Sequence, residues 1–409
     1  MPYDADILIS GASFAGLALA SALSAALRGE ARIAIVDRAD AGGGAADDIR
    51  ASAVALGSVR ILQAIGVWRH VADLAQPVTA IDITDGHLDS PARPVFLGYD
   101  NHADGEPATV ILPNQLLQQA LADGVAADPA IEIVRGDGVV GYGAGKGHAT
   151  VTLGSGRTLA APLVVAADGR RSALREAAGI KTVGWTYAQT GIVTTVGHQR
   201  PHGGKAVQHF LPAGPFAILP LAGGMTSSLV WSEDETRVPH LMALDDVAFL
   251  AEVEQRFGGR LGRLRLAGPR AAFPLEMHIA RRLVADRLAL VGDSARVMHP
   301  IAGQGLNMAL RDVAALTEVT VGAMRVGLDF GGAETLLRYE RWRRFDSVVS
   351  AGAFDTLNRL FSNDVALVRA ARDFGLGLVE RAPELKRLLV AEAAGLMGER
   401  PKLLDGVLP

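Results

Sequence analysis

The residues with the clearest chemical potential lie between positions 286 and 316, where a carboxylate and a glycine-rich turn stand close together. Arg287–Val291 predicts a buried strand, and Asp293 follows its carboxyl end, which is where open α/β sheets bind ligands. Gly303 and Gly305 allow the backbone to approach a ligand closely, and the helix that they open has unpaired N–H groups at its start. We therefore expect a site for a negative atom or a polarised carbonyl. The apolar face of that helix comprises Leu306, Leu310, Val313 and Leu316.

The amino terminus has the pattern of a nucleotide-binding strand–helix–strand unit. Asp6–Ser10 predicts a strand, Leu17–Leu27 predicts a helix, and Ile33–Val36 predicts a second strand. Asp37 follows that second strand and stands 21 residues beyond the last glycine of the first turn. This spacing is typical of a carboxylate that accepts hydrogen bonds from a ribose hydroxyl pair.

The turn of this unit runs Gly-Ala-Ser-Phe-Ala-Gly over residues 11–16. Gly11 is expected to make the tight turn, and Gly16 to allow the helix to pack on the strand. Ser13 stands where a glycine usually permits the closest approach of a pyrophosphate to the backbone. Together with the Asp293 segment, the turn predicts a nucleotide site built from two distant parts of the chain.

Three other interpretations of this terminus are less consistent with the residues. Ile7–Leu27 contains no charged residue over 21 positions, but a membrane span would bury a Gly-Ala-Ser turn without reason. A signal peptide begins with basic residues, whereas Asp4 and Asp6 stand here. A hydrolase nucleophile elbow needs a second glycine where this chain has Ala15.

A third motif lies at Leu163–Arg175, where an apolar run leads into Asp168 and Gly169. It predicts a carboxylate at a strand end with a basic cluster behind it. Asp-Gly by itself is merely a favourable turn sequence. The position of this pair between the other two motifs is what favours a functional role for Asp168. The basic cluster comprises Arg170, Arg171 and Arg175.

Residues 136–156 match two phosphate-binding patterns by their letters alone. Gly136–Gly141 fits the dinucleotide pattern, and Gly145 with Lys146 resembles part of a phosphate loop. No helix-like pattern follows, and Gly147 stands where a phosphate loop needs Ser or Thr. The alternating run Ala149–Leu153 instead predicts a β-hairpin. The chain therefore has a single dinucleotide fingerprint.

Composition limits the classes of function. A chain of 409 residues is long enough for two or three structural units. A net charge of −4 and a pI near 6.2 give no electrostatic footprint for nucleic acid. The absence of cysteine excludes disulfides, thiolate catalysis and Cys-ligated metals, and no metal site is expected. No targeting segment is visible, which favours a cytoplasmic location.

Taken together, the three motifs resemble those of the class A FAD-dependent aromatic hydroxylases, which have the para-hydroxybenzoate hydroxylase fold. The run HPIAGQGLN at residues 299–307 is similar to the ubiquinone-biosynthesis branch, the 2-polyprenyl-6-methoxyphenol hydroxylases. The resemblance extends over nearly the whole chain. Outside the nucleotide motifs it rests on Trp185, Tyr187, Gln189, Gln208, His209, Phe210, Gly214, Pro215, Leu219, Pro220, Leu221, Val230 and Trp231.

The resemblance implies a fold and its boundaries. We expect an α/β protein with a doubly wound, Rossmann-like FAD-binding domain of the GR2 type, formed by residues 1–75, 100–181 and 286–335. The runs between Val183 and Glu233 are short, β-prone and separated by Gly and Pro, which predicts an antiparallel sheet. This sheet, residues 76–99 and 182–285, is the expected substrate domain. Residues 336–409 form the expected C-terminal helical region.

The resemblance also implies the residues that hold FAD. Arg50 matches an arginine near the flavin ring, and Asn114 a position that contacts the ribityl chain, although Gln115 stands where relatives often have Arg. A surface charge at Arg50 and a helix N-cap at Asn114 are the alternative interpretations. The full expected set is Gly11, Ser13, Phe14, Ala15, Gly16, Asp37, Arg38, Arg50, Asn114, Asp168, Gly292, Asp293, Pro300, Gly303, Gln304, Gly305, Leu306 and Asn307.

The implied chemistry is that of a monooxygenase. NADPH or NADH reduces FAD, dioxygen adds to the flavin C4a atom, and the hydroperoxide transfers OH to a polyprenylated phenol. Pro300 and Gly303 are expected in the catalytic turn, and His209 and Tyr187 are candidates for an acid–base role, with a structural role for His209 as the alternative. Other functions left open are a hydroxylase of another phenol or polyketide, a flavin-dependent prenyl reductase and a non-catalytic scaffold.

Two interpretations of the C-terminal region also stay open. It is either a helical tail packed on the flavin domain, or an amphipathic segment in which Leu378, Leu388 and Leu389 touch a bilayer beside basic residues. The second interpretation would place the protein peripherally on the inner face of the membrane, together with other ubiquinone-biosynthesis proteins. An oligomer is compatible with either.

Overall fold

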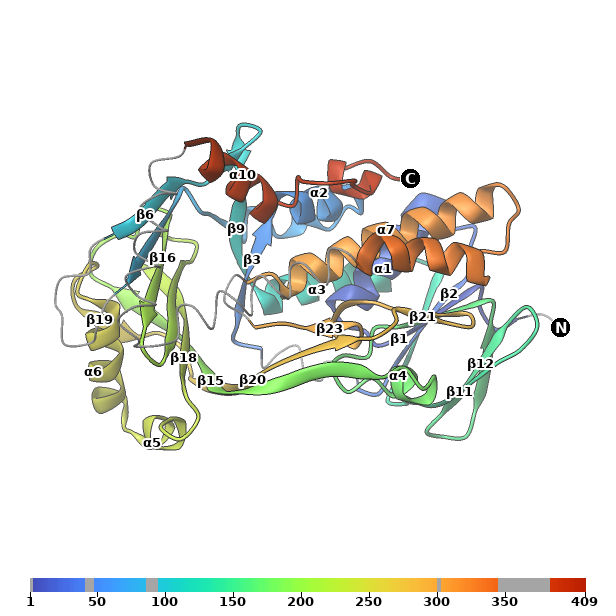
Figure 1. Cartoon of the computed structure of the whole chain (residues 1–409), viewed down its shortest axis with the longest axis horizontal. Coiled ribbons are helices and arrows are strands. Elements are labelled where there is room, and N and C mark those ends of the chain that lie inside the picture. Colours follow the sequence, from blue (N-terminus) through green and yellow to red (C-terminus); the bar gives the residue numbers. More distant parts are fainter. Residues whose placement is uncertain (1–2, 41–47, 86–94, 300–302, 345–382) are drawn as a thin grey trace.

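The structure is a computed structural model that describes residues 3–40, 48–85, 95–299, 303–344 and 383–409. Figure 1 shows a parallel sheet with its helices at one end of the molecule and a large, mostly antiparallel sheet at the other. Two long strands run between these ends along one side, β15 (Thr182–His198) and β20 (Ala271–Ala280).

The parallel sheet has six strands in the order β10-β2-β1-β14-β22-β21. The first five pair in parallel, and the last pairs antiparallel at the edge. The central strands of a sheet that helices cover on both faces are continuous apolar runs in the sequence. Strands β1, β2, β14 and β22 lie at the runs predicted in the three motifs, which confirms those predictions. The bounds are β10 (Ile131–Arg135), β2 (Ile33–Asp37), β1 (Ile7–Ser10), β14 (Leu163–Ala166), β22 (Leu288–Leu290) and β21 (Val284–Ala285).

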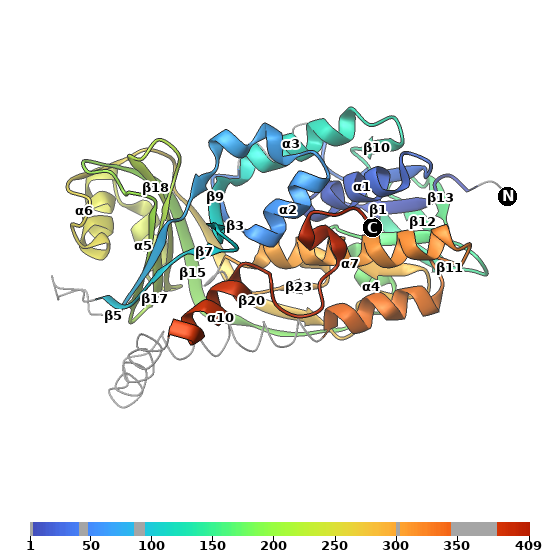
Figure 2. The same cartoon turned by 90° about the horizontal axis from the view of Figure 1, so that it is seen from above.

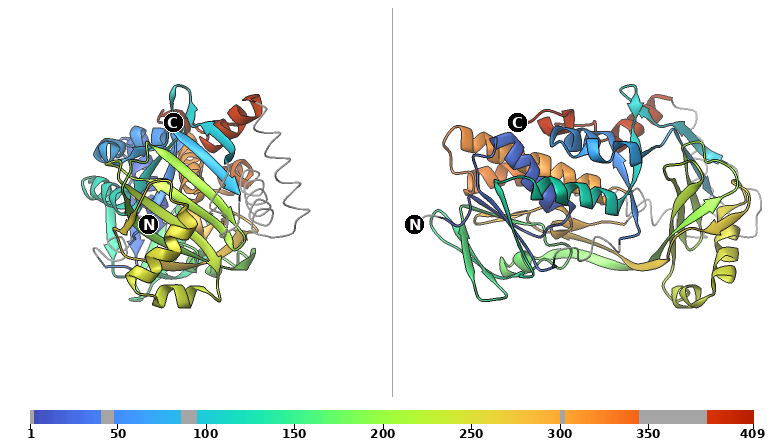
Figure 3. Two further views of the ribbon diagram at one scale, coloured as in Figure 1. Left: turned by 90° about the vertical axis from the view of Figure 1, so that its left-hand side faces the viewer. Right: turned by 180° about the vertical axis from the view of Figure 1, so that it is seen from behind.

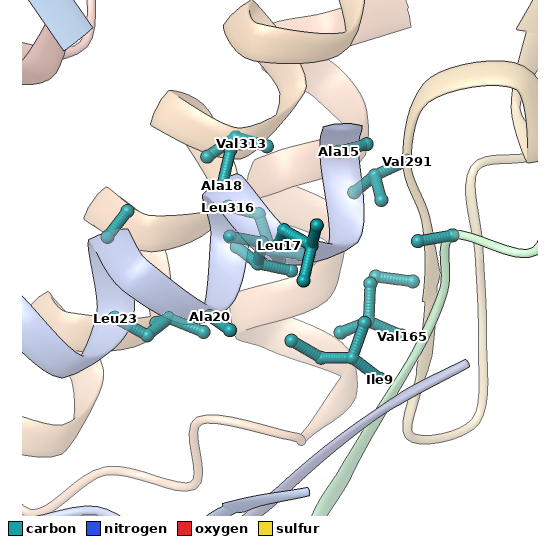
Figure 4. Close-up of a cluster of buried hydrophobic side chains, with 14 of the residues drawn as sticks. Ile9, Ala15, Leu17, Ala18, Ala20, Leu23, Val165, Val291, Val313 and Leu316 are labelled. Carbon is teal, nitrogen blue, oxygen red and sulfur yellow. The ribbon is translucent and has the colours of Figure 1, made fainter. Parts of the chain in front are cut away.

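Helices α1 (Phe14–Leu27) and α7 (Gly305–Arg325) form the core with this sheet. Figure 4 shows Leu17 and Leu23 of α1 with Val313 and Leu316 of α7 among the buried side chains. The predicted apolar face of α7 is confirmed, since Leu310, Val313 and Leu316 are fully buried and Leu306 packs against the same core. Other helices of this half are α2 (Leu56–Ala64), α3 (Asn114–Ala126), α4 (Ala173–Ala177), a helix over residues 333–344, and the short turns η1 (Trp68–His70), η2 (Ala72–Leu74) and η3 (Gly292–Ser294).

Three small sheets complete the framework. Antiparallel strands β11 (Val139–Ala144), β12 (Ala149–Leu153) and β13 (Thr158–Ala161) confirm the hairpin predicted for residues 136–156 and rule out a phosphate loop there. The others are β3-β9-β4 and β7-β8, whose bounds are β3 (Ala51–Ala55), β9 (Thr109–Pro113), β4 (Gln76–Pro77), β7 (His102–Ala103) and β8 (Glu106–Pro107).

The large sheet has the order β23-β20-β15-β18-β17-β16-β5-β6, with β19 paired to β15. The antiparallel prediction is correct except between β5 and β16, which are parallel, and β23 joins the sheet from the segment that carries Asp293. The remaining bounds are β23 (Arg296–Val297), β18 (Thr226–Asp234), β17 (Gly214–Pro220), β16 (Lys205–Leu211), β5 (Ala80–Asp85), β6 (Val95–Asp100) and β19 (Leu264–Leu266).

The two faces of the large sheet have different neighbours. Helices α5 (Val238–Ala243) and α6 (Asp246–Phe257) cover its outer face, as Figure 2 shows at one end of the molecule. A second hydrophobic core lies between them and the sheet and includes Phe216, Trp231 and Phe249. The other face of the sheet is turned toward the parallel-sheet half.

The end of the chain packs on the parallel-sheet half, beside α2 (Figure 3). Leu403 and Leu404 of η5 (Lys402–Asp405) belong to its core, and the Gly57 N–H donates to the Ala394 carbonyl over 2.9 Å. The packed-tail interpretation is thus confirmed for the stretch after α10 (Pro383–Ala393). Leu378 and the side chains of Leu388 and Leu389 lie outside what the structure describes, and none of its described helices has the length and hydrophobicity to span a bilayer.

Candidate active site

A cavity of about 1360 Å³ lies between the parallel-sheet half and the inner face of the large sheet. The three sequence motifs meet on one side of it, although they are separated by more than a hundred residues in the chain. The predicted site residues that line it are Ser13, Phe14, Ala15, Arg38, Arg50, Asn114, Asp168, Gly292, Asp293, Gly303, Gln304, Gly305 and Leu306.

Two glycines behind this wall allow the first turn to pack against β14. Gly11 has a φ of 106°, and a Cβ there would lie 2.4 Å from the Ala167 carbonyl oxygen. A Cβ on Gly16 would lie 2.0 Å from the Gly11 carbonyl oxygen. Any side chain at either position would separate the helix from the turn, so both predicted roles, the tight turn and the close packing, agree with the geometry.

Ser13 replaces the usual middle glycine and has its own structural use. It is the N-cap of α1, where its hydroxyl accepts from the Gly16 N–H at 3.4 Å. The same hydroxyl donates to the Ala167 carbonyl at 2.9 Å, which ties the turn to the end of β14. A serine is a favoured N-cap because it satisfies one of the unpaired N–H groups of the helix start.

Asp37 sits at the end of β2, as its motif predicts, but is not among the described residues that line the cavity. Its carboxylate accepts from the backbone N–H groups of Ala12 and Ala39. These bonds fix the carboxylate beside the first turn. Its contact with a ribose therefore stays a prediction.

Arg50 and Asn114 are joined by an acid that sequence reasoning missed. Asp48 pairs with the Arg50 guanidinium at 2.7 and 2.8 Å and accepts from the Asn114 amide at 2.9 Å. Burial raises the pKa of Asp48, but hydrogen bonds from Arg50 and Asn114 outweigh it and leave that pKa lowered. The N-cap interpretation of Asn114 is wrong, since its amide oxygen accepts from Ser52 at 2.7 Å and Pro113 precedes the helix without a side-chain cap. Asp48 stands only two residues before Arg50, which is the one signal that could have revealed it.

Arg50 itself reaches over the cavity. Its guanidinium carbon lies 5.2 Å from the centre of the Phe273 ring, on a strand of the large sheet. The hydrogen bond to Asp48 raises the pKa of Arg50, and the charge of Asp293 acts in the same direction. Arg50 thus holds a positive charge between the two halves of the site. Its contacts with Asp48 and Phe273 favour the site interpretation over that of a solvated surface charge.

Asp293 projects into the cavity from η3, one residue past the tight Gly292 turn. Its side chain is open to the cavity on one side, and protein surrounds it on the others. This burial raises the pKa of its carboxyl, and the Arg50 charge opposes the rise. His278 donates to the Asp293 carbonyl at 3.3 Å, and Ser294 donates to the Ala166 carbonyl at 2.5 Å. The carboxylate is therefore presented by a turn that is bonded on both sides.

A buried ionic cluster supports this turn, and the sequence analysis did not identify it. Asp312 of α7 accepts from Arg296 at 2.7 and 2.9 Å, from Arg343 at 2.8 Å and from the Gly292 N–H at 3.0 Å. Burial by itself would raise the pKa of Asp312, but the charges of Arg296 and Arg343 outweigh burial and leave that pKa lowered. The carboxyl group therefore stays ionised. The cluster joins α7, the 333–344 helix and the Asp293 turn.

Two polar atoms on the cofactor side of the cavity lack a partner within the described chain. The Asp168 carboxyl oxygen Oδ1 and the Arg296 Nε are buried without a hydrogen bond, and both residues line the cavity. The other carboxyl oxygen of Asp168 accepts from the Leu174 N–H at 3.4 Å. Burial nevertheless raises the pKa of Asp168. A bound molecule whose hydroxyl donates to the Asp168 oxygen and whose anionic oxygen accepts from the Arg296 Nε–H would satisfy both atoms. FAD offers both kinds of group.

The turn before α7 lies close to β3. Gly303 has a φ of 60°, and a Cβ there would lie 3.1 Å from the Ala53 Cβ. Helix α7 begins at Gly305 without a side-chain cap, so its first N–H groups are available to a ligand. Asn307 has a different place, since its buried amide bonds to Ala55, Ser58 and Ala53 and holds the turn on β3. Pro300 lies outside the described residues.

The expected acid–base role of His209 is corrected by its orientation. His209 is 1% exposed, contacts Thr84 and stacks on Phe216 with ring centres 6.3 Å apart, on the helix-covered face of the sheet. Successive side chains of a strand point to opposite faces. The cavity is lined by Ala206, Val207, Gln208 and Phe210 of β16, and His209 is not among its described lining residues. His209 therefore has the structural role that was its alternative.

Tyr187 is not among the described residues that line the cavity either. Its ring packs edge-on against His299 with centres 5.1 Å apart, and its hydroxyl points to the Met277 sulfur at 3.6 Å. Its described contacts are therefore those of a supporting residue, and an acid–base role for Tyr187 stays a prediction.

The sheet side of the cavity is almost entirely apolar. Side chains from the inner faces of β5, β6 and β15 to β18 form it, and they differ sharply from the charged opposite wall. They are Ile81, Ile83, Leu97, Val193, Ala206, Phe210, Ala217, Leu219 and Val230. One cavity thus combines a wall suited to a dinucleotide cofactor with a wall suited to an aromatic or aliphatic molecule.

The comparisons with known proteins agree with this geometry. Residues 4–344 match the model of the FAD-binding domain family. The p-nitrophenol 4-monooxygenase from Pseudomonas putida has the same fold, with a TM-score of 0.78 over 97% of this chain and 98% of that one, at 18% sequence identity. The fold is therefore that of the class A flavin hydroxylases.

Two curated relatives narrow the position within that class. The chain is 44% identical to the ubiquinone hydroxylase UbiL of Rhodospirillum rubrum, over 98% of this chain and 93% of the relative. It is 32% identical to the 3-demethoxyubiquinol 3-hydroxylase of Escherichia coli, over 96% and 98%. The chain belongs to the ubiquinone-hydroxylase branch of the FAD-binding family. It is a flavin-dependent monooxygenase that uses FAD, NAD(P)H, dioxygen and an aromatic substrate.

Proposed function

We propose that this enzyme hydroxylates the ring of a polyprenylated phenol in ubiquinone biosynthesis. The observation that carries the proposal is the single cavity with one charged wall and one apolar wall. The relatives named for ubiquinone hydroxylation support the pathway, because they match almost the full length of this chain. An apolar wall of this extent suits a ring that carries an isoprenoid chain.

The residues divide the work as follows. Asp293, Asp168, Arg50 and the start of α7 would hold FAD, with Asp293 accepting from a ribityl hydroxyl. When bound, FAD accepts electrons from NAD(P)H and activates dioxygen for transfer of one oxygen atom to the ring. The large sheet holds the ring and its chain and excludes water from the reacting atoms. Residues 76–99 and 182–285 are accordingly the proposed substrate domain, and residues 1–75, 100–181 and 286–335 the FAD domain.

A coupled assay tests the proposed reaction. The purified enzyme is supplied with NADPH and a short-chain 2-prenylphenol, and hydroxylated product is measured against hydrogen peroxide. The wild type is expected to form mostly product and to need dioxygen. Equal turnover without dioxygen would favour a prenyl reductase, and turnover only of other phenols or polyketides would move the substrate assignment. Protein that neither retains FAD nor oxidises NADPH would be a scaffold.

Gly303→Val tests whether the turn before α7 shapes the reaction site. The left-handed φ strains any side chain at this position, and its Cβ would press on the Ala53 side chain, so the turn is expected to shift. Asp293 is untouched, and FAD is expected to stay bound while the main product becomes hydrogen peroxide. Gly322→Val, on an exposed part of the same helix, is the matched control, because a Cβ there meets no atom within 4 Å. Equal product yield in Gly303→Val and the control would refute this role.

A membrane contact of the C-terminal region is the finer part of the proposal. Lys386 of α10 lines the cavity and Arg387 follows it on the same helix. A substrate with a long isoprenoid chain resides in lipid. Deletion from about Arg381 should release the enzyme from anionic liposomes. If the full chain never co-sediments with such liposomes, the region serves packing alone.

A further inference from the structure

The apolar wall of the cavity contains one polar side chain without a partner in the described chain. Gln208 of β16 lines the cavity, and its amide nitrogen is buried without a hydrogen bond. Buried amides are normally paired, because a buried donor without a partner keeps its full desolvation cost. Among the described residues that line the cavity, only Asp168 and Arg296 share this state, and both belong to the cofactor wall.

The register of the sheet explains why Gln208 is so isolated. It stands opposite Ala217 on β17 and Ile83 on β5, while Ala206 and Phe210 flank it along its own strand. All four neighbours line the cavity and none has a polar side chain. The other polar groups of β16 lie elsewhere, since His209 points to the helix-covered face. The amide is therefore surrounded by apolar side chains on its own strand and on both neighbouring strands.

We infer that Gln208 recognises the oxygen substituent of the substrate ring. A bound phenol would supply the partner that the amide lacks, and the broad terminal torsion of Gln lets it present either its NH₂ or its carbonyl. This hydrogen bond would fix the rotation of the ring against the flavin and so select the carbon that is hydroxylated. The amide does not titrate, so Gln208 positions the ring and transfers no proton. The inference rests on the proposed function for the identity of the ring.

A pair of ligands separates this role from simple packing. Wild type and Gln208→Leu are each titrated with 2-prenylphenol and with prenylbenzene, which lacks the oxygen, and dissociation constants are read from the absorbance change of bound FAD. Because an unpaired buried polar group strongly disfavours the analogue that lacks the hydrogen-bonding atom, the wild type should prefer the phenol by about tenfold or more. Gln208→Leu should bind both ligands within about twofold of each other.

The controls make each outcome decisive. Gln199→Leu is the same substitution on an exposed end of the same sheet and should keep the wild-type preference. Gln208→Met, also apolar and of similar length, replaces the Leu variant if that variant does not fold. If Gln208→Leu keeps the preference, or loses affinity for both ligands equally, the inference is overturned. The binding readout needs no turnover, so a wild type that makes no hydroxylated product refutes the proposed function alone.

A product measurement adds a second readout. With 2-prenylphenol, Gln208→Leu is expected to form a mixture of ring-hydroxylated isomers and more hydrogen peroxide, because the ring is free to rotate. A residue that only fills space would change the affinity without changing the isomer ratio. A single isomer from the variant at the wild-type yield would contradict the inference.

Discussion

The two walls of the cavity are built by different rules. The cofactor wall comes from turns at strand ends, where glycines allow close contact and buried charges are tied to one another, as in the Asp312 cluster. The substrate wall comes from the faces of strands and is mostly apolar, with the Gln208 amide unpaired among apolar neighbours. Buried charges and close contact between backbone segments therefore define the cofactor wall. The alternation of side chains along strands defines the substrate wall.

This difference predicts how each wall responds to mutation. Changes in the cofactor wall should affect stability and FAD affinity together, since the groups that present Asp293 are also buried ion pairs. Changes in the substrate wall should affect ligand preference and coupling while the fold is retained. Three substitutions in and behind the cofactor wall, and one on the far face of the sheet, complement the Gln208 variants in testing this contrast. They follow in decreasing order of the expected effect.

Asp312→Ala should have the largest effect. It leaves Arg296 and Arg343 buried without their shared carboxylate and frees the Gly292 N–H. Removing one partner of a buried ion pair costs about 3–5 kcal/mol, so the melting temperature should fall steeply and FAD should be lost with it. The measurement is thermal unfolding with and without added FAD. A variant of wild-type stability would show that the cluster does not support the turn.

Asp293→Ala should act on the cofactor with a smaller change in stability. Loss of a charge-assisted hydrogen bond of about 1.5–3 kcal/mol corresponds to roughly ten- to hundredfold weaker FAD binding. The absorbance of the purified protein reports the occupancy. Asp246→Ala, an exposed Asp whose partner is Arg270, is the matched control and should stay yellow. Full occupancy in Asp293→Ala would remove this residue from the FAD site.

Asp168→Asn should stabilise the FAD-free protein and weaken its affinity for FAD. Burial raises the pKa of Asp168, so its ionised form is disfavoured in the folded state and stability falls as pH rises through that raised pKa. At neutral pH the FAD-free Asn variant should therefore melt above the wild type, and the gap should close below pH 3.8, where the carboxyl is protonated in both states. An FAD-free variant less stable than wild type at neutral pH would contradict this assignment.

His209→Phe should have the smallest effect on catalysis. The ring stacking on Phe216 is kept, and the Thr84 hydroxyl loses its partner at a cost of about 1–3 kcal/mol. The turnover number should stay within about twofold of wild type, because the side chain lies on the face away from the cavity. Steady-state hydroxylation at several ring concentrations measures this. A collapse of turnover with unchanged stability would return His209 to the list of catalytic residues.

The sequence by itself determined the cofactor wall to a large extent. Each motif is a strand, a turn and a helix that are contiguous in the chain, and Gly11, Asp168 and Asp293 take their positions from local backbone geometry. Because ligands bind beyond the carboxyl ends of parallel strands, the motifs had to converge once the strands paired. The resemblance to flavin hydroxylases followed from the same residues, and the relatives confirm it.

Only the tertiary structure decided the substrate wall and the supports behind the cofactor. Asp312 meets Arg296 and Arg343 through the packing of α7 against two other segments. Asp48 pairs with Arg50 locally, but only the fold brings it to Asn114. The choice between His209 and Gln208 was decided by the face that β16 turns to the cavity. A shift of one residue in a strand exchanges the two faces, and only the pairing of β16 with β5 and β17 determines which face lies inside.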